Sequence, residues 1–410
     1  PVETRAGDYT RQVVYTVVGE LMPEPVISNI EPDVYKATTV NKILVNNNGD
    51  LYALVSDGTI KKFNGYTVSD YYISSDGITD FATGGHSYAF TLLKTDSNEI
   101  HSFGYNNYGQ LGNGEVGSSI SSDTPANITN AFTAPVIKLY AGADYSAAVT
   151  MDNHVYMWGY GDSGNLGTGN SNNQLAPVDI TNNFPTINGR IVDMSLADDI
   201  RTATTFALTD AGHVYGWGDG RSGALGTGKN QYEYYPVDIT DNFNLASSES
   251  IIHVATNSGN GSWGYGLALT DKGRVFSWGD GKNGTLGNGS TADSYLPKDI
   301  TTYFQLDNGD KIVAIGAGIQ KTFAISANGI VYAWGEDLSS LTPTIISGSD
   351  KFLGMNTQGA YIATSLRLNS YLLDGANNIY VVANIPYYIT TPIIEKIINS
   401  NIKVGEMVLM

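Results

Sequence analysis

The stretch that decides the fold is Trp217-Gly218-Asp219-Gly220-Arg221-Ser222-Gly223-Ala224-Leu225-Gly226-Thr227-Gly228. Its frame, [WF]-G-x-x-x-x-G-x-L-G-x-G, recurs three more times along the chain. The other copies are Phe103-Gly104 with Leu111, Trp158-Gly159 with Leu166, and Trp278-Gly279 with Leu286. Units that repeat in this way bury their hydrophobic faces against one another, so the repeat determines the architecture.

Short apolar runs flank each copy of the frame. Upstream, two runs are separated by a turn, as in Ala147 to Thr150 and Val155 to Trp158; downstream, Pro-x-Asp-Ile-Thr recurs at Pro177, Pro236 and Pro297. The runs are rich in β-branched and aromatic residues and end in Asn-Gly, Asp-Gly or Ala-Gly turns, which is typical of strands in hairpins. No long helical period competes with this pattern. The sequence therefore predicts an all-β protein.

The frame continues toward both ends in weaker form. A fifth copy starts at Trp334-Gly335 and then loses its Gly-Leu-Gly part, while Leu54 and Val382 take the aromatic position of a first and a last unit. The resulting column has seven members, at positions 54, 103, 158, 217, 278, 334 and 382. About four strands per unit are too few to bury both faces of a sheet alone, so we predict a seven-bladed β-propeller.

Two further features of the repeat receive a local interpretation. The Leu of each frame is interpreted as a plug that packs the glycine-rich loop onto its own blade. A Phe recurs after the Pro-x-Asp-Ile-Thr strands and is interpreted as an anchor for the following loop. The members of this set are Phe132, Phe184, Phe243 and Phe304.

The repeats divide the chain into a propeller at residues 36–386 and two flanking segments, 1–35 and 387–410. An open propeller would leave exposed strand edges, so we expect one flanking segment to supply a strand that closes the ring. Gln12 to Gly19 and Pro392 to Ile398 are the candidate strands. The other flanking segment would then attach the propeller to a larger, symmetric assembly.

Composition excludes several classes of function. The chain has 410 residues with 22 Lys and Arg against 40 Asp and Glu, a net charge of −18, which disfavours nucleic acid because phosphate binding requires basic residues. The absence of Cys excludes disulfides, zinc–thiolate sites and iron–sulfur clusters. No apolar run reaches the length of about 18 residues that a membrane helix needs, so no membrane insertion is predicted.

These motifs resemble the regulator-of-chromosome-condensation repeat. The resemblance rests on the Trp-Gly frame preceded by Ala268-Leu269-Thr270 and by Val-Tyr-x-Trp, and it spans roughly Val40 to Val382. It implies a seven-bladed propeller. The Pro-x-Asp-Ile-Thr-x-x-Phe insertions resemble bacterial and phage-encoded members. The family is named for a chromatin-bound exchange factor of a small GTPase, which makes nucleotide exchange an alternative function.

No catalytic constellation emerges from the residues. There is no nucleophile elbow, zincin helix or phosphate loop, and the five His lie at turn or strand-edge positions. The acidic turns at Asp219 and Asp280 carry one carboxylate each and are followed by Arg221 or Lys282, which opposes a bound cation. We therefore predict a protein that is not an enzyme and has no metal and no cofactor.

Two columns that vary between repeats supply the candidate partner-binding residues. The first lies before the strand that precedes the aromatic, where the resemblance implies His: its candidates are His86, Tyr145, Tyr265 and Lys321. The second follows the Trp-Gly pair: its candidates are Tyr105, Tyr108, Tyr160, Arg221 and Lys282. Tyr and Arg are enriched at protein interfaces. A recognition surface and simple drift at solvated positions are the two interpretations of these columns.

The sequence favours a non-enzymatic propeller that binds a protein partner or a cell-surface receptor. Low charge and Asn-, Tyr-, Ser- and Thr-rich loops suit a component displayed on a virus particle, as a tail, fibre or capsid decoration, or on a bacterial surface. An extracellular or virion location is expected, with secretion into a host cell as the alternative. A guanine-nucleotide exchange factor or effector of a small GTPase is the first alternative function, and a secreted inhibitor propeller is the second.

Overall fold

The computed structural model describes residues 40–45, 51–63, 68–72, 76–85, 88–197, 203–258, 263–318, 321–335 and 339–345. It also describes the strands at 361–364, 369–373, 379–383 and 404–409. The described part of the chain is all-β apart from short 3-10 turns, and its strands pair into four-stranded sheets in chain order. The predicted all-β class is confirmed.

The sheets and their strands follow one another along the chain. The first three sheets are β1 (Val40–Val45), β2 (Leu51–Val55), β3 (Ile60–Phe63) and β4 (Val68–Tyr72); β5 (Ile78–Gly84), β6 (Phe90–Thr95), β7 (Ile100–Asn106) and β8 (Gly117–Asn127); and β9 (Val136–Ala141), β10 (Tyr145–Thr150), β11 (Val155–Gly159) and β12 (Gln174–Asp179). The next two are β13 (Ile191–Leu196), β14 (Thr204–Thr209), β15 (Val214–Gly218) and β16 (Glu233–Asp238); and β17 (Ile251–Ser258), β18 (Gly264–Thr270), β19 (Val275–Gly279) and β20 (Ser294–Asp299). The last two are β21 (Ile312–Ala317), β22 (Lys321–Ser326), β23 (Val331–Gly335) and β24 (Ser340–Ile345); and β25 (Tyr361–Thr364), β26 (Asn369–Leu373), β27 (Ile379–Ala383) and β28 (Val404–Leu409).

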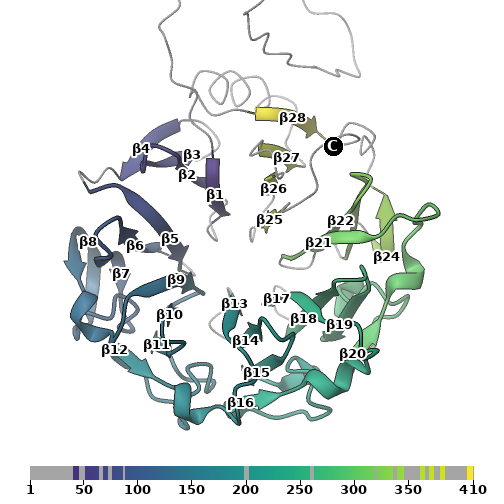
Figure 1. Ribbon diagram of the computed structural model, residues 1–410, viewed down its shortest axis with the longest axis horizontal. Coiled ribbons are helices and arrows are strands. Elements are labelled where there is room, and N and C mark those ends of the chain that lie inside the picture. The colour runs from purple at the N-terminus through teal and green to yellow at the C-terminus, as the bar shows by residue number, and fades with distance from the viewer. Residues whose placement is uncertain are drawn as a thin grey trace, which may run out of the picture.

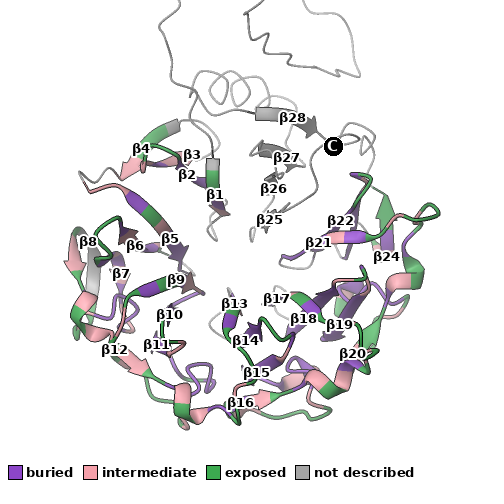
Figure 2. Cartoon of the chain, viewed as in Figure 1, coloured by how far each residue is buried: buried purple, intermediate pink, exposed green. Residues whose placement is uncertain are grey.

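The sheets radiate around a common centre, which is the arrangement of a β-propeller (Figure 1). The first strand of each sheet is innermost and contacts the first strand of the next sheet, and β1 also contacts β25. The outermost strands are mainly half-buried or exposed, whereas the second and third strands are buried (Figure 2). The hydrophobic core therefore lies between neighbouring sheets.

The last sheet differs from the others in one strand. The other six sheets are antiparallel throughout, but β28 pairs with β27 in parallel, with Ile379 opposite Val404. Because β28 comes from residues 387–410, the C-terminal flanking segment contributes the fourth strand of this sheet. The strands predicted at Gln12 to Gly19 and Pro392 to Ile398 lie outside the described residues.

The predicted aromatic column lies on the third strand of each sheet, with one exception. Phe103, the four Trp of the column and Val382 all occupy third strands. Leu54 lies instead on the second strand β2, between Lys42 of β1 and Ile60 of β3. The placement of Leu54 in the column is therefore wrong.

The register of the first sheet identifies the residue that replaces Leu54. Phe63 of β3 is paired with Leu51 of β2, just as Trp158 of β11 is paired with Ser146 of β10. Phe63 therefore belongs to the aromatic column. The prediction was displaced by one strand because the first sheet has short strands and the sequence has a turn dipeptide both before and after β2, Asn48-Gly49 and Asp57-Gly58.

The Trp side chains join each sheet to the one before it. Each of the four column indoles donates from Nε1–H to a backbone carbonyl in the glycine-rich loop of the preceding sheet, at 2.8 to 3.0 Å. The pairs are Trp158 with Gln110, Trp217 with Asn165, Trp278 with Ala224, and Trp334 with Thr285. All four side chains are fully buried, so each indole donor has the partner that burial demands.

The Leu and Phe of the repeat contribute to the same boundary. We predicted that the Leu packs onto its own blade. Leu166 lies in one buried cluster with Trp217 of the next sheet, so it also packs across the boundary. Phe184 meets the same Trp217 edge to face, with ring centroids 5.5 Å apart. The Phe is an anchor, as predicted, but it is anchored on the following sheet. We call this combination of indole hydrogen bond, Leu and Phe the Trp interlock.

The boundary between the first two sheets has no Trp interlock in the described residues. Phe103 of β7 is stacked on Tyr72 of β4 with ring centroids 5.4 Å apart, and it also meets Tyr71 at 5.8 Å. Phe103 is only half-buried. This boundary is therefore held by ring packing together with cross-sheet hydrogen bonds of Lys42 and Tyr71, without an indole donor.

Candidate protein-binding face

One face of the ring carries the loops that join the first strand to the second and the third strand to the fourth. Because neighbouring strands run antiparallel in the first six sheets, these two kinds of loop emerge on the same side of each of those sheets. The candidate residues that follow the Trp-Gly pair all lie in these loops or at their start. His86, from the other column, lies outside the described residues.

The structure corrects the first candidate column. Tyr145 and Tyr265 are fully buried and Lys321 is 6% exposed, so these residues lie in the boundaries and not on a contact surface. The hydroxyl of Tyr145 donates to the carbonyl of Thr204 in the next sheet at 3.1 Å and accepts the N–H of Ala197 at 2.9 Å.

Tyr265 makes the equivalent bridge two sheets further on. Its hydroxyl donates to the carbonyl of Gly318 at 2.6 Å, and burial raises the pKa of Tyr265. The register also shows that Phe90, and not His86, is the equivalent residue of the second sheet, because Phe90 is paired with Gly104 as Tyr145 is with Gly159. These positions connect neighbouring sheets.

Most of the second candidate column groups with additional aromatic residues in three contacting sets on this face. We call this surface the aromatic band; its members are Tyr88, Tyr105, Tyr108, Tyr160, Arg221, Tyr232 and Trp263. All are half-buried or exposed, and Tyr88 is 64% exposed. The band crosses from the β5–β8 sheet to the β17–β20 sheet.

The first part of the aromatic band consists of two Tyr pairs. The ring centroids of Tyr88 and Tyr105 are 5.1 Å apart, and Tyr108 meets Tyr160 edge to face at 4.8 Å. The hydroxyl of Tyr160 donates to Asp162 at 3.1 Å. Burial, reinforced by the Asp162 carboxylate, raises the pKa of Tyr160 to about 12, so this hydroxyl stays a donor at neutral pH.

The second part is centred on Arg221. Its guanidinium lies 3.8 Å from the ring centroid of Trp263 and 5.0 Å from that of Tyr232. The fork also pairs with Asp219, which is 1% exposed: Nη2 reaches Oδ2 at 2.6 Å and Nε reaches Oδ1 at 3.0 Å. This hydrogen bonding to Asp219 raises the pKa of Arg221, and it fixes the cation as a flat platform between two rings.

A buried carboxylate positions Trp263 next to this platform. Asp280 is 5% exposed and accepts the backbone N–H of Trp263 at 2.6 Å and that of Lys282 at 2.8 Å. Burial raises the pKa of Asp280. The side chain of Trp263 is thereby held at the surface, where it is 38% exposed. Lys282, which was predicted from the sequence, is exposed beside it.

Three members of the aromatic band, Tyr88, Tyr232 and Trp263, are not among the residues predicted from the two columns. A usable signal existed for Trp263, because it is the one Trp of five that stands outside the aromatic column. A Trp that is not needed for packing between sheets can instead contribute to a binding surface. Tyr88 sits in the corresponding loop of the β5–β8 sheet and carries no comparable signal.

The described residues offer little to small-molecule or metal chemistry. In the ranges that the structure describes, no group of three His, Asp or Glu is arranged to hold a metal ion. Among these same residues, no helix has the length and apolar character needed to cross a membrane. The face is therefore best characterised by its aromatic and guanidinium groups.

Four-stranded sheets joined by a repeated Trp and Gly-Leu-Gly signature define a β-propeller built from tandem units. The repeat of the regulator of chromosome condensation (RCC1) matches residues 97–149, 152–203, 211–257 and 272–325. The chain belongs to the RCC1 repeat family.

Named relatives place the similarity among eukaryotic proteins. The chain is 29% identical over 290 residues to the human E3 ubiquitin-protein ligase HERC2, covering 71% of this chain and 6% of HERC2. It is 31% identical over 245 residues to the Arabidopsis thaliana ultraviolet-B receptor UVR8, covering 60% of this chain and 50% of UVR8. The chain thus spans half or less of the length of these relatives, and they lend no support to the predicted bacterial or phage type.

Solved structures agree on the fold. Yeast RCC1 (Prp20), solved with Kap60 bound, superposes with a TM-score of 0.57 at 21% identity, covering 76% of this chain and 70% of that one. At this identity the similarity concerns the propeller fold alone.

Proposed function

We propose that this chain is a non-enzymatic protein-binding module that presents the aromatic band to a protein partner. The observation that carries the proposal is the Arg221 platform, an ion-paired guanidinium held between Tyr232 and Trp263 on an exposed face. Tyr, Trp and Arg are the residues that dominate binding energy at protein interfaces. Preorganisation by Asp219 and Asp280 reduces the entropy lost when a partner binds.

We further propose that the sheets form a closed ring of seven blades. The contact between β1 and β25 and the strand β28 from the C-terminal segment support this closure. A closed ring would hold the loops of the aromatic band in fixed relative positions. Residues 1–35 would then remain available for attachment.

The location of the protein and its partner class remain predictions from the sequence. Display on a virus particle or a cell surface has no support among the relatives, whose names describe eukaryotic proteins. Guanine-nucleotide exchange is the second candidate function, favoured by membership of the RCC1 repeat family.

The test compares the loss of partner binding on removing one Trp and one Tyr side chain that are equally exposed and lie on opposite faces. Trp263 in the aromatic band and Tyr303, between β20 and β21, are each 38% exposed. Partners retained by the immobilised chain are identified and purified, and their affinities are measured by calorimetry. We expect Trp263→Ala to weaken binding by about 2 kcal/mol or more and Tyr303→Ala to leave it unchanged.

The same set of variants separates the alternatives. Equal affinity of the Trp263→Ala and wild-type proteins for every purified partner would refute the role of the aromatic band. Nucleotide release from a panel of small GTPases, stimulated by the wild-type chain, would promote the exchange function instead.

A further inference from the structure

Two cavities lie at boundaries between sheets, on the face opposite the aromatic band. One, of about 310 Å³, lies between the first two sheets and is lined by residues that include Asp57, Gly77 and Asp96. The other, of about 390 Å³, lies between the β13–β16 and β17–β20 sheets. Its lining includes His213, Asp241, Glu249 and Ser250. Both open beside the turns that join second and third strands.

The two cavities occupy the same place in the repeat. In each, a turn glycine of one sheet faces the residue just before the first strand of the next sheet. A Cβ added at Gly212 would lie 2.9 Å from Cβ of Ser250, and one added at Gly58 would lie 3.0 Å from Cα of Gly77. Gly273 faces Lys311 in the same way, at 2.6 Å from its Cβ.

At two other boundaries the equivalent residue is basic and crosses the gap. Arg190, just before β13, donates from Nη2 to the carbonyl of Met151 at 2.9 Å. Lys311, just before β21, donates from Nζ to the carbonyl of Asp271 at 3.1 Å. Met151 and Asp271 each follow the Thr that ends a second strand, so both cations reach the same point of the repeat.

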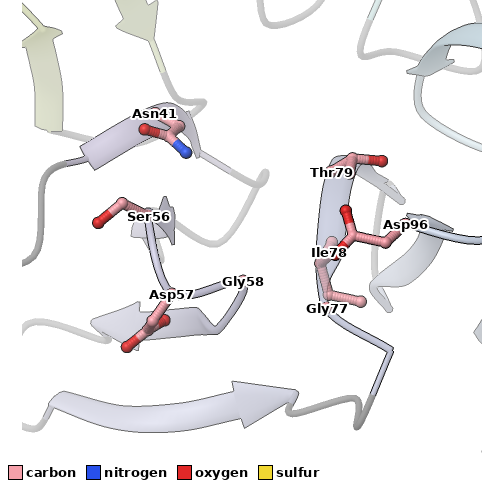
Figure 3. A pocket seen from close by; sticks show the side chains of 8 residues that line it. All are labelled: Asn41, Ser56, Asp57, Gly58, Gly77, Ile78, Thr79 and Asp96. Carbon is pink, nitrogen blue, oxygen red and sulfur yellow. The ribbon is translucent and has the colours of Figure 1, made fainter.

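At the two cavities this basic side chain is missing. Ser250 and Gly77 stand where the filled boundaries have Arg190 and Lys311, and neither reaches across. At both boundaries a short residue that lines the cavity therefore takes the sequence position of the long basic side chain. Figure 3 shows the first cavity, with Ser56 and Asp57 on one wall and Thr79 and Asp96 on the other.

The lining of both cavities is suited to a cation. The first carries the carboxylates of Asp57 and Asp96. In the second, the Glu249 side chain is 5% exposed; its Oε2 accepts from Arg274 at 2.9 Å, while its Oε1 has no hydrogen-bond partner among the described residues. Asp241 adds another carboxylate to that lining, while Arg274 is ion-paired with Glu249 and the charge of Lys272 also acts on Glu249.

We propose that these two cavities are sockets for basic side chains of a protein partner. Each takes a primary ammonium or guanidinium group on a flexible stem, in the position that Arg190 and Lys311 occupy within the chain itself. The carbonyl at the turn and the lining carboxylates supply charge-assisted hydrogen bonds to the incoming cation. This site lies on the face opposite the aromatic band and does not depend on the function proposed for that band.

The socket beside Ser250 is tested by NMR on the full chain at low ionic strength. The probe is the peptide acetyl-Gly-Lys-Gly-amide, and the matched control is acetyl-Gly-norleucine-Gly-amide, which keeps the stem without the charge. The imidazole signals of His213, assigned with His213→Gln, report on this cavity. We expect saturable shifts with the Lys peptide in the millimolar range and none with norleucine.

Two variants make the test specific. Ser250→Lys should fill its own socket as Lys311 does, retain the fold, and weaken the Lys peptide by about tenfold or more. Lys311→Ser should open a third socket and add one binding equivalent. Equal responses to the two peptides, or undiminished binding by a folded Ser250→Lys protein, would overturn the proposal; if Ser250→Lys does not fold, the absence of a gain in Lys311→Ser overturns it.

Discussion

Two kinds of boundary hold the sheets together, and they differ in what they require of the sequence. Where the Trp interlock is present, an indole donor, a Leu and a Phe converge, as at Trp217 with Asn165, Leu166 and Phe184. Between the first two sheets, Phe103 packs on Tyr71 and Tyr72, and the hydrogen bonds come from other side chains, such as Lys42 to Asp80. In the interlocked boundary the packed ring itself donates the directional hydrogen bond, so one side chain fixes both distance and register.

The comparison shows why the glycine-rich frame and the Trp occur together. A buried indole N–H without an acceptor lowers the free energy of unfolding. A Trp therefore stabilises a boundary only where the preceding sheet places a backbone carbonyl within hydrogen-bond distance of its Nε1. The β1–β4 sheet has no Gly-Leu-Gly loop, and the next sheet accordingly carries Phe103 in place of Trp. A ring without a donor suits a boundary without an acceptor.

The largest expected effect comes from removing an indole. Trp217→Ala should lower the free energy of unfolding by about 3–5 kcal/mol, because it creates a large cavity and removes the indole hydrogen bond to the Asn165 carbonyl, which keeps its bond from Thr205 Oγ1. Phe103→Ala should cost less, because Phe103 is half-buried and donates no hydrogen bond. Urea denaturation of both variants checks the order, and an equal or larger loss at Phe103 would contradict the comparison.

The next effect concerns the glycine after the Trp. Gly218 has a φ of 100°, and an added Cβ would lie 2.4 Å from the carbonyl oxygen of Ala203. Gly218→Ala should therefore cost roughly 3 kcal/mol through backbone strain and the clash. Gly117→Ala, with no atom within 4 Å of the added Cβ, is the neutral control in the same thermal melts. Similar melting temperatures for both variants would rule out a requirement for glycine at 218.

A smaller effect is expected at the Tyr bridge between sheets. Tyr145→Phe keeps the ring but removes the hydroxyl that accepts the Ala197 N–H and donates to Thr204, so a buried hydrogen-bond network loses a member while the Ala197 N–H keeps the Thr204 carbonyl. We expect a loss of about 1–2 kcal/mol. Tyr235→Phe serves as the control, because Tyr235 is 53% exposed. Equal stability of the two variants would show that the bridge contributes nothing.

The smallest effect should come from a surface pair within one sheet. His154 Nδ1 lies 2.6 Å from Asp179 Oδ2, and this hydrogen bond raises the pKa of His154. The stabilisation is fully present below the unfolded-state pKa of about 6.5 and is lost as the pH rises through the folded-state pKa. Because the side chain of His154 is 38% exposed, solvent screening limits the effect to a few tenths of a kcal/mol, roughly.

The measurement for His154 is a difference between two pH values. His154→Gln should be less stable than the wild type at about pH 5.5 and closer to it at about pH 8.5. A gap that widens toward high pH would have the wrong sign and would contradict the assignment of the pair.

Much of this fold is predictable because the same pattern of strands, turns and Trp-Gly frame recurs in successive units. The Trp-Gly frame identified the all-β class, the tandem units and the third-strand position of every Trp in the column. The first sheet escaped prediction because its strands are short and Asn48-Gly49 and Asp57-Gly58 are both good turn dipeptides, so the pattern does not distinguish β2 from β3. Pairing across the sheet was needed to select Phe63 over Leu54.

The candidate site was only partly predictable. Tyr105, Tyr108, Tyr160 and Arg221 were predicted as partner-binding residues because they vary beside a fixed aromatic-Gly pair, and the structure places them on the surface. Tyr145 and Tyr265 were wrongly predicted to lie on a surface because a single sequence does not distinguish a buried Tyr from an exposed one. Exposure depends on the neighbouring sheet, which lies about 60 residues away in the chain.

The Trp interlock has a direction, because each unit receives a ring from the unit that follows and inserts its own into the unit before. Each such unit therefore presents a Trp on one side and a glycine-rich loop that accepts a Trp on the other. Duplicating or deleting one interlocked unit would leave every remaining joint matched, so evolution can lengthen or shorten the series without redesigning an interface. The exception is the pair Tyr71 and Tyr72, which packs against the ring of Phe103 in a sheet that has no Gly-Leu-Gly loop. This boundary therefore precedes the first interlocked unit.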